Sequence, residues 1–432
     1  MSWSFKTDPE FQELLDWTRE FVREEIEPLD YVLDHPYNMA DPLRNELIAP
    51  LQKIVKDKGL WATHLGPNLG GPGYGQVKLA LLNEILGTSR AAPIVFGCQA
   101  PDSGNAEILA HYGSEDLKRR YLTPLINGNI VSCFSMTEPQ GGSDPTRFLL
   151  HAELDGEEWV INGEKWFSSH ARYAEFLITM AVTEAEGTPY RRQSMLVVPA
   201  STPGIEIVRN TGVFGDPDET GTHAYLRYHD VRVPADHLLG ERGEGFNVAQ
   251  TRLGGGRIHH AMRTMGLAKR AFEMMCERAV SRKASGDEFL GRKQMVQEMI
   301  ADSWIEIEQF RLLVLQTAWK IDEYNDYKRV RADISAVKAA MPKLLNSVAS
   351  RAVQIHGSLG ISNEMPFGGW VLESYHMGLA DGATEVHKAT LARQVLSTVT
   401  PSTTLFPDYH LIEERRRARE RFAEPLARHG RA

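Results

Sequence analysis

Apolar residues in the first third of the chain recur every three or four positions, a spacing typical of helices that bury one face. The first run follows Thr7-Asp8-Pro9, where a capping hydroxyl and a proline favour a helix start. Further runs cover residues 42–58, 77–86 and 105–125, the last with Gly113 near a break. The glycine-rich stretch 69–75 lacks the Lys-Ser/Thr pair of a P-loop, so we expect a turn there. These patterns predict an all-helical unit over residues 1–133.

At Phe134 the apolar period changes from three or four residues to two. Stretches rich in β-branched or aromatic residues predict strands at 176–182, 194–198, 205–208 and 224–233. Asp155-Gly156 and Asn162-Gly163 are pairs typical of tight hairpin turns. We therefore expect a small β-domain, a barrel or a sandwich, over residues 134–245.

Helical periodicity returns at Phe246. Three apolar stripes begin near Met262, Val296 and Ile334, with Pro342 expected to kink the third, and a last helix is expected from about Ala383. These predict a C-terminal four-helix bundle over residues 246–400. Residues 401–432 form a charged tail in which acids interrupt the arginines, so a solvated helix or a subunit contact is expected rather than nucleic-acid binding.

Composition narrows the class of protein. A chain of 432 residues exceeds one typical core, so two or three packed units are expected. The net charge of −9 argues against a nucleic-acid or anionic-membrane partner. Three cysteines, Cys98, Cys133 and Cys276, are too few to staple the chain, which favours a reducing compartment. The first ten residues lack the features of a signal peptide and no window approaches the ~20 apolar residues of a membrane span, so we expect a cytoplasmic protein.

The loop from Phe134 to Asp144 has the composition of a ligand-binding turn. Gly141 and Gly142 allow close approach of the backbone, while Thr137 and Ser143 supply hydroxyl donors. An ordinary surface turn is the alternative, because Gly and Pro mark most turns.

The order of the segments that follow this loop is informative. Phe134-Ser135-Met136-Thr137-Glu138-Pro139-Gln140-Gly141-Gly142-Ser143-Asp144, Asn162-Gly163-Glu164-Lys165-Trp166-Phe167-Ser168, Arg257, Arg282, Gln354-Ile355-His356-Gly357 and Asp381-Gly382 occur in that order. Together they resemble the acyl-CoA dehydrogenases, and the resemblance covers roughly residues 8 to 400. Cys98 to Asn105, Gly255 to His260 and Leu379 to Gly382 resemble the bacterial branch related to animal acyl-CoA dehydrogenases fused behind a kinase-like domain.

This resemblance implies a fold that is mainly α with a central β-domain: an N-terminal helical domain, a small β-barrel and a C-terminal four-helix bundle. It implies FAD as cofactor, bound at the flavin edge by Phe134, Met136, Thr137, Gly142, Ser143, Trp166, Phe167 and Ser168. It also implies a homodimer or homotetramer, in which further flavin contacts come from Arg282, Gln294, Gln354, Gly357 and Glu385. Two matches are weaker: Trp166 has a core-aromatic alternative, and the segment from Arg282 to Gln294 is slightly longer than in better-known members.

The reaction implied is α,β-dehydrogenation of an acyl-CoA to the trans-2-enoyl-CoA, with electrons passed to an electron-transfer flavoprotein or similar acceptor. Asp381 matches the catalytic base, while Ser143, Arg257 and Gly382 match substrate-binding positions. We expect burial to raise the pKa of Asp381 above its ordinary ~3.9. Asp in place of the usual Glu, beside Ala380 in place of a bulky aromatic, suggests a long, branched or hydroxylated acyl group. Without the motif order, Asp381-Gly382 is typical of a turn.

Other functions receive less support from the sequence. A flavin oxidase of the same fold, acyl-CoA or nitroalkane type, and a non-catalytic flavin-binding scaffold stay open. Glu373-x-x-His376 matches half of a di-iron pattern without a second copy, so we expect no metal site. A Ser-His-Asp hydrolase is not supported, because the chain has no Gly-x-Ser-x-Gly elbow.

Overall fold

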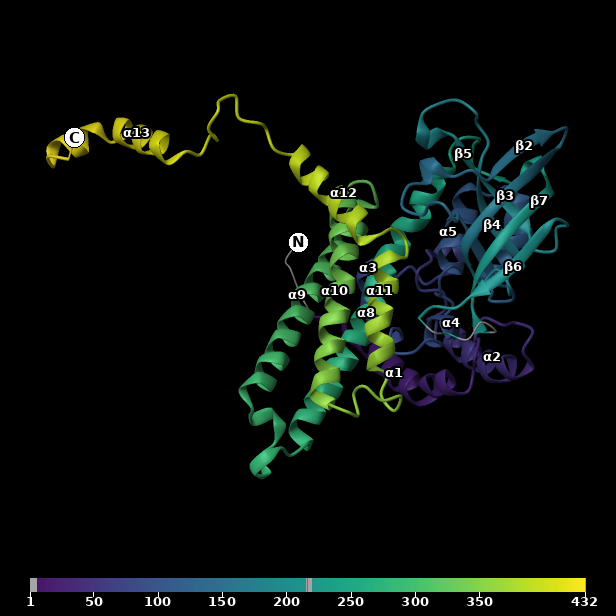
Figure 1. The fold of residues 1–432 in the computed structure, drawn as a ribbon, viewed down its shortest axis with the longest axis horizontal. Helices are drawn as coiled ribbons and strands as arrows, with labels where there is room; N and C mark the ends of the chain where they lie inside the picture. The colour runs from purple at the N-terminus through teal and green to yellow at the C-terminus, as the bar shows by residue number, and fades with distance from the viewer. Residues whose placement is uncertain (1–5, 215, 217–219, 432) are drawn as a thin grey trace.

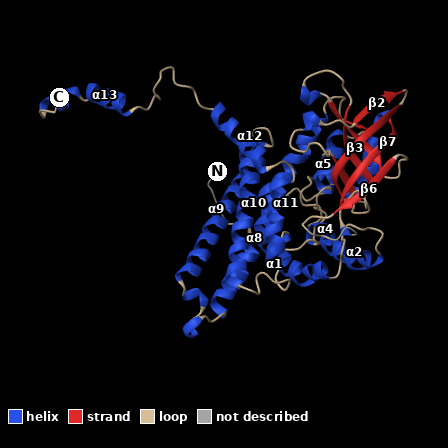
Figure 2. Ribbon diagram, viewed as in Figure 1, coloured by secondary structure: helices blue, strands red, loops and turns tan. Residues whose placement is uncertain are grey.

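The computed structural model describes residues 6–214, 216 and 220–431, and its helices flank one central sheet. In Figure 1 the long helices of the C-terminal half stand beside the sheet, and the N-terminal helices lie below it. Figure 2 shows that strands occur only in this central region of the described chain. The predicted absence of a leader rests partly on residues 1–5, which lie outside the described residues.

The N-terminal helices follow the predicted pattern, with differences at their ends. The longer ones are α1 (Pro9–Phe21), α2 (Pro42–Asp57), α3 (Gly75–Leu86) and α5 (Asp102–Tyr112), and the shorter ones are α4 (Ala92–Val95), α6 (Glu115–Leu117) and α7 (Thr123–Ile126). The cap of α1 is Asp8, whose carboxylate accepts the peptide N–H of Phe11 at 2.9 Å, and not the expected hydroxyl. Gly113 ends α5, so the run predicted over 105–125 is several shorter helices.

The β-domain is one curled sheet of eight strands. They are β1 (Ser132–Ser135), β2 (His151–Asp155), β3 (Glu158–Ser169), β4 (Phe176–Val182), β5 (Gln193–Pro199), β6 (Ile205–Thr211), β7 (His223–Pro234) and β8 (Leu238–Leu239). They run in the order β6-β7-β3-β2-β4-β5-β8, with β1 parallel to β4. Alternate residues of β4 face opposite ways: Leu177 packs in a core within the sheet, and Ile178 packs against helices. The sheet is thus an open barrel with helices on its outer face.

One of the two hairpin predictions is wrong. Asp155 pairs with Glu158 across a two-residue turn that contains Gly156, as expected. Asn162-Gly163 instead lies inside β3 at a register shift. Gly163 has a φ of 135°, and a Cβ there would lie 2.7 Å from Leu150 Cα, so glycine marks a bulge under close backbone contact.

Five helices build the C-terminal half: α8 (Gly245–Ser281), α9 (Gln294–Tyr324), α10 (Arg331–His356), α11 (Phe367–Leu379) and α12 (Thr384–Ser397). The predicted stripes are buried in one shared core, for example Met262 from α8 and Met341 from α10. Pro342 lies inside α10, which continues through it, and α11 was not predicted as a separate helix. Helix α3 also contributes to this core through Leu79, which ties the bundle to the N-terminal helices.

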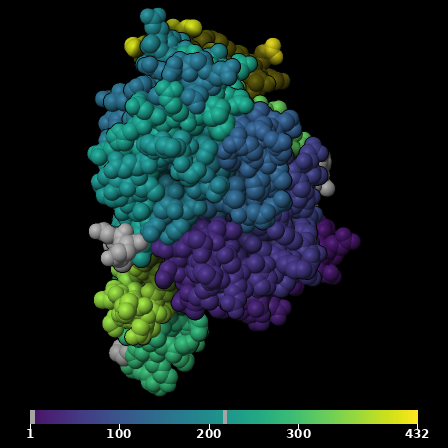
Figure 3. All heavy atoms as spheres, turned by 90° about the vertical axis from the view of Figure 1, so that its right-hand side faces the viewer, coloured from purple at the N-terminus to yellow at the C-terminus, as the bar shows by residue number. Residues whose placement is uncertain are grey.

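The remaining chain extends away from the body. After α12 the chain leaves the bundle and ends in α13 (Leu411–Arg421) and α14 (Ala423–Arg428) (Figure 1). Arg416 of α13 pairs with Glu413 and Glu420 on its own helix, which fits a solvated helix. Figure 3 shows the right-hand side of the view in Figure 1, where the N-terminal helices and the β-domain form one continuous surface.

Candidate functional site

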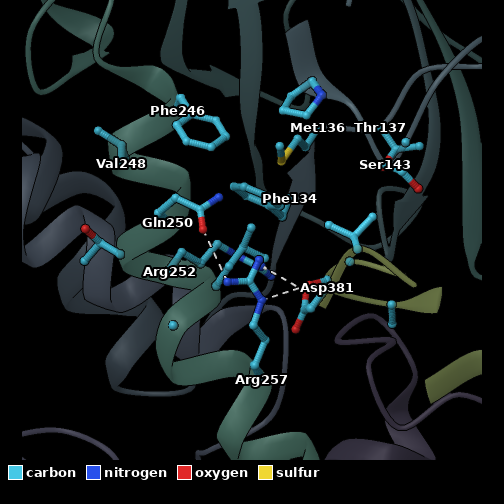
Figure 4. Close-up of a pocket in the computed structure, with 18 of the residues that line it drawn as sticks. Phe134, Met136, Thr137, Ser143, Phe246, Val248, Gln250, Arg252, Arg257 and Asp381 are labelled. Atoms are coloured by element: carbon cyan, nitrogen blue, oxygen red, sulfur yellow. Dashed lines mark hydrogen bonds and ion pairs between the residues drawn. The ribbon is translucent and has the colours of Figure 1, made fainter. Parts of the chain in front are cut away.

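A large cavity of about 2000 Å³ opens where the β-domain meets the bundle. Its wall combines the loop after β1, the middle of β3, one face of α8, the α9–α10 connection and the α11–α12 connection. Of the predicted site residues, the following line it: Phe134, Met136, Thr137, Gly142, Ser143, Trp166, Phe167, Arg257, Asp381 and Gly382. Segments more than 200 residues apart in sequence therefore meet at one site (Figure 4).

A buried ion pair and two main-chain contacts hold the loop after β1 against β3. The peptide N–H of Trp166 donates to the carbonyl of Thr137 at 2.8 Å. Lys165 Nζ donates to the carbonyl of Met136 and lies 2.8 Å from Oε1 of Glu138. Both charged side chains are buried, and burial lowers the pKa of Lys165 to about 8 although Glu138 opposes this shift. The loop and the aromatic residues after Lys165 are thereby placed on the same side of the cavity.

The aromatic pair after Lys165 forms part of the cavity wall. The ring of Trp166 packs edge-on against Tyr225 and Phe167, and the guanidinium of Arg209 lies 5.3 Å from its centre. Phe167 has a φ of 53° and stacks on His223, with ring centres 4.8 Å apart. The core-aromatic alternative for Trp166 is therefore not supported, because Trp166 lines the cavity.

Ser168 lies differently from its neighbours. Its hydroxyl is buried inside the β-domain, 2.8 Å from that of Ser135, which in turn lies 3.2 Å from the hydroxyl of Tyr228. The following residue, Ser169, lines the cavity instead. Ser168 as a whole is buried and does not line the cavity, so the structure does not expose it to a ligand there.

Asp381 occupies the short connection between α11 and α12. Its backbone is left-handed, with φ 55°, and Gly382 follows with φ 107°. The carbonyl oxygen of Asp381 accepts Nε of Arg257 at 2.9 Å and lies 3.3 Å from Nε2 of His387. Its peptide N–H donates to no residue in the described part of the chain. The connection thus provides the site with both a carboxylate and an unpaired N–H.

One face of α8 surrounds the Asp381 carboxylate. Oδ1 lies 3.7 Å from Nη1 of Arg252, and Oδ2 lies 3.6 Å from Nε2 of His260. Between them, a Cβ at Gly256 would lie 3.0 Å from Oδ2, so glycine leaves room for the carboxylate. Positions 252, 256 and 260 are four residues apart and therefore share one helix face.

The expected rise in the pKa of Asp381 is wrong for this structure. Burial alone would raise it, but His260, Arg252, Arg257 and Lys338 together hold the pKa of Asp381 below its ordinary value. Burial lowers the pKa of His260, although the charge of Asp381 opposes this shift. The three cations Arg252, Arg257 and Lys338 stabilise the ionised carboxylate.

Sequence reasoning missed two of these cations, Arg252 and Lys338. Burial lowers the pKa of Lys338 to about 8, and its Nζ is hydrogen-bonded to the carbonyl of Met377. The four-residue spacing from Arg252 to His260 was a usable signal, whereas nothing local relates Lys338 to residues 40 positions later. His260 faces Asp381, while His259 is buried against Gln76.

A second, smaller cavity of about 180 Å³ is lined by some of the residues predicted to make the further flavin contacts. Arg282 and Gln354 line it, together with Leu290 and Val296. A Cβ at Gly357 would lie 3.3 Å from Nη1 of Arg282, so Gly357 is adjacent. These residues do not line the large cavity.

Besides Ser168 and Gly357, the predicted residues Gln294 and Glu385 line neither cavity. Gln294 is the first residue of α9, and Glu385 is exposed in the first turn of α12. Glu373 and His376 contact each other at 3.2 Å, and this hydrogen bond raises the pKa of His376 although burial opposes it. Among the described residues, no helix has the length and apolar character needed to cross a bilayer.

Comparison with known proteins identifies three consecutive domains of one family. Residues 8–129 match the N-terminal domain, residues 133–231 the middle domain and residues 243–396 the C-terminal domain of acyl-CoA dehydrogenases.

Two curated relatives illustrate the similarity. The rat (Rattus norvegicus) protein "Acyl-CoA dehydrogenase family member 11" is 39% identical over 395 residues, which are 89% of this chain and 50% of that protein. The chain therefore spans about half the length of that relative. "Probable acyl-CoA dehydrogenase FadE2" of Mycobacterium tuberculosis is 42% identical over 364 residues, covering 83% of this chain and 88% of that protein.

Solved structures agree with this assignment. A Mycobacterium abscessus protein described as an acyl-CoA dehydrogenase superposes with a TM-score of 0.83 at 38% identity, covering 91% of this chain and 100% of that chain. A glutaryl-coenzyme A dehydrogenase in complex with glutaryl-CoA gives a TM-score of 0.79 at 26% identity, covering 92% of this chain and 98% of that chain.

Proposed function

The chain belongs to the acyl-CoA dehydrogenase family of flavin-dependent oxidoreductases, and we propose that it converts an acyl-CoA thioester into the trans-2-enoyl-CoA with FAD as cofactor. The observation that carries this proposal is the position of Asp381. Its carboxylate meets the Thr137 and Trp166 wall in a single cavity large enough for a dinucleotide and a thioester.

The wall of the cavity fits a flavin. Trp166, Phe167 and Met136 provide apolar surface for a flat ring. The hydroxyls of Thr137 and Ser143 have no hydrogen-bond partner among the described residues, so both are free for the polar edge of a ligand. These residues would hold the isoalloxazine, and bound FAD supplies the acceptor for the hydride that leaves the β-carbon.

The chain's own residues would carry the proton chemistry. Asp381 removes the α-proton, which requires the carboxylate to be ionised before substrate binds; the surrounding cations supply that condition. The unpaired N–H of Asp381 is a donor for the thioester carbonyl, whose polarisation acidifies the α-carbon. Arg257 holds the Asp381 carbonyl and thereby fixes the orientation of that peptide.

The substrate end of the cavity favours a bulky acyl group. Ala380 lines the cavity next to the base, where a larger side chain would take space from the acyl chain. We therefore infer a long, branched or otherwise substituted acyl chain as substrate. We also infer a homo-oligomer and transfer of electrons to an electron-transfer flavoprotein or similar acceptor.

Anaerobic reduction of the bound flavin tests this function. The purified yellow protein is mixed with acyl-CoAs of different length and branching while the oxidised flavin absorbance is followed. We expect rapid bleaching by one group of thioesters and its loss, by about a hundredfold or more, in Asp381→Asn. Glu241→Gln is the matched control, because Glu241 also lines the cavity but lies outside the proposed chemistry.

The same assay separates the remaining alternatives. Bleaching followed by fast reoxidation in air would indicate an oxidase. Absence of bleaching by every thioester, in a protein that retains flavin, would contradict the dehydrogenase and leave a nitroalkane-type oxidase or a scaffold.

A further inference from the structure

The motif from Gln99 to Asn105 builds a buried polar network that the proposed chemistry leaves unexplained. The carboxylate of Asp102 accepts Nε2 of Gln99 at 3.0 Å and the hydroxyl of Ser132 at 2.6 Å. The Ser132 hydroxyl in turn accepts Nδ2 of Asn105 at 2.9 Å. All four side chains are at least nine-tenths buried, so the hydrogen bonds among them offset the free energy lost when polar groups leave water.

The network ends on Arg252. Nε of Arg252 donates to Oδ1 of Asn105 at 3.0 Å, and the guanidinium lies 3.9 Å from the centre of the Phe134 ring. A Cβ at Gly104 would lie 2.8 Å from Cγ of Arg252, so the glycine makes room for this side chain. Arg252 is thus held by a hydrogen bond, an aromatic face and close packing on three sides.

The opposite edge of the same guanidinium faces the base. Nη1 of Arg252 is 3.7 Å from Oδ1 of Asp381, while Arg257 engages only the carbonyl of Asp381. The other charged or titratable groups around this carboxylate are His260 from α8, Lys338 from α10, His376 from α11 and His387 from α12. Among the arginines near Asp381, it is Arg252 whose guanidinium forms an ion pair with the carboxylate itself.

We propose that Arg252, aimed by the Gln99–Asn105 network, is a positioning residue that fixes the Asp381 carboxylate in the cavity and keeps it an anion when substrate excludes water. The proposal rests on the proposed function in that Asp381 is taken as the base. It accounts for the motif, since Asp102 orients Ser132, Ser132 orients Asn105, and Asn105 orients Arg252.

Protonation of Asp381 can be measured without turnover. In infrared difference spectra of the FAD-loaded protein, the carboxylic acid band absent from Asp381→Asn reports the protonated base. We expect its midpoint to rise by about 1 to 3 pH units in Arg252→Gln, because an opposite charge within ~4–6 Å lowers a carboxyl pKa by that amount. Arg252→Lys keeps the charge, so its midpoint should stay nearer that of the parent protein.

The rate should follow the same order. In the anaerobic flavin assay, the acid limb of the plot of kcat/KM against pH should shift to higher pH in Arg252→Gln. In Arg252→Lys it should lie near that of the parent protein. Asn105→Ala leaves the charge but frees the guanidinium, so it should lower kcat at every pH. Ser103→Ala is the control, since Ser103 lies in the same motif and its hydroxyl bonds to no described residue.

Two results would overturn the proposal. One is an unchanged infrared midpoint in a folded, flavin-loaded Arg252→Gln protein. The other is an equal loss of rate in Ser103→Ala and Asn105→Ala. A shifted midpoint in a protein that no acyl-CoA reduces would instead support the role of Arg252 and contradict the proposed function.

Discussion

At the residue scale, the Glu138 carboxylate shows how a signature residue can serve structure. Besides Lys165, it accepts the peptide N–H groups of Leu149 and Leu150 at 2.6 and 3.0 Å. Its side chain is 1% exposed, so it cannot contact a ligand in the cavity. Glu138 therefore acts through the loop that it holds, whereas Thr137 and Ser143 on that loop face the cavity.

We predict that Lys165→Met destabilises the protein by about 3–5 kcal/mol, because it leaves the buried Glu138 charge without its partner. Denaturant unfolding of the FAD-free protein would measure this, so that lost flavin binding is not counted as lost stability. The double variant Glu138→Gln with Lys165→Met should recover part of the loss.

An exposed pair provides the control for this prediction. Arg232 and Asp155 lie in the same β-domain at 2.8 Å, with side chains 47% and 66% exposed. Arg232→Met should lower the free energy of unfolding by about 1 kcal/mol or less. Equal losses of unfolding free energy in Arg232→Met and Lys165→Met would contradict the prediction that breaking the buried pair costs more than breaking an exposed one.

At the element scale, local pattern predicted most helices and strands, and failed where tertiary contact decides. The range of β4 was predicted as it is found, since the strand is rich in β-branched and aromatic residues and its neighbours are turns. The hairpin turn predicted at Asn162-Gly163 was wrong, because a glycine packed against Leu150 and a glycine in a hairpin turn look alike in sequence. Helix α11 was missed because its apolar stripe is short: its buried residues are Phe367, Ser374 and Met377.

The site followed a similar division. Motif order pointed to Thr137, Trp166 and Asp381, and the structure brings them to one cavity from a loop, from within β3 and from the connection between α11 and α12. The ionisation of Asp381 could not be predicted, because it depends on Arg252 and Lys338, which reach it only through the packing of α8 and α10.

The end of α11 provides the test of acyl-group preference. Ala380→Tyr adds an aromatic ring to the cavity wall beside Asp381, so kcat/KM for long or branched acyl-CoAs should fall by about tenfold or more. Short straight-chain acyl-CoAs should lose much less. Leu372→Tyr is the matched control, because Leu372 lies on the same helix, is 37% exposed and does not line the cavity. Unchanged relative kcat/KM values across the series would contradict the inferred substrate class.

At the whole-molecule scale, the separation of the two cavities bears on assembly. Arg282 and Gln354 line the small cavity, whereas Asp381 and the flavin-type loop line the large one. A dinucleotide in the large cavity therefore cannot meet Arg282 within the same cavity. In a symmetric oligomer, the small cavity of one subunit can complete the large cavity of its neighbour.

Mixed oligomers test this arrangement directly. Asp381→Asn removes the base but keeps Arg282, and Arg282→Glu keeps the base but repels the diphosphate. Each variant alone should be inactive. If two differently tagged variants are co-expressed and the mixed oligomer is isolated through both tags, some sites will combine an intact Asp381 from one subunit with an intact Arg282 from the other.

We expect such mixed oligomers to regain a quarter to a half of the activity per flavin site, because only sites formed across an intact pair of residues can turn over. Oligomers that pair a subunit carrying both changes with an unaltered subunit provide the opposite control, because sharing of sites between subunits leaves them no site with both Asp381 and Arg282 intact. If Arg282 served its own subunit, no site in the first mixture would hold both residues. Its activity would then stay at the level of the separate variants, and the proposed sharing of sites between subunits would be wrong.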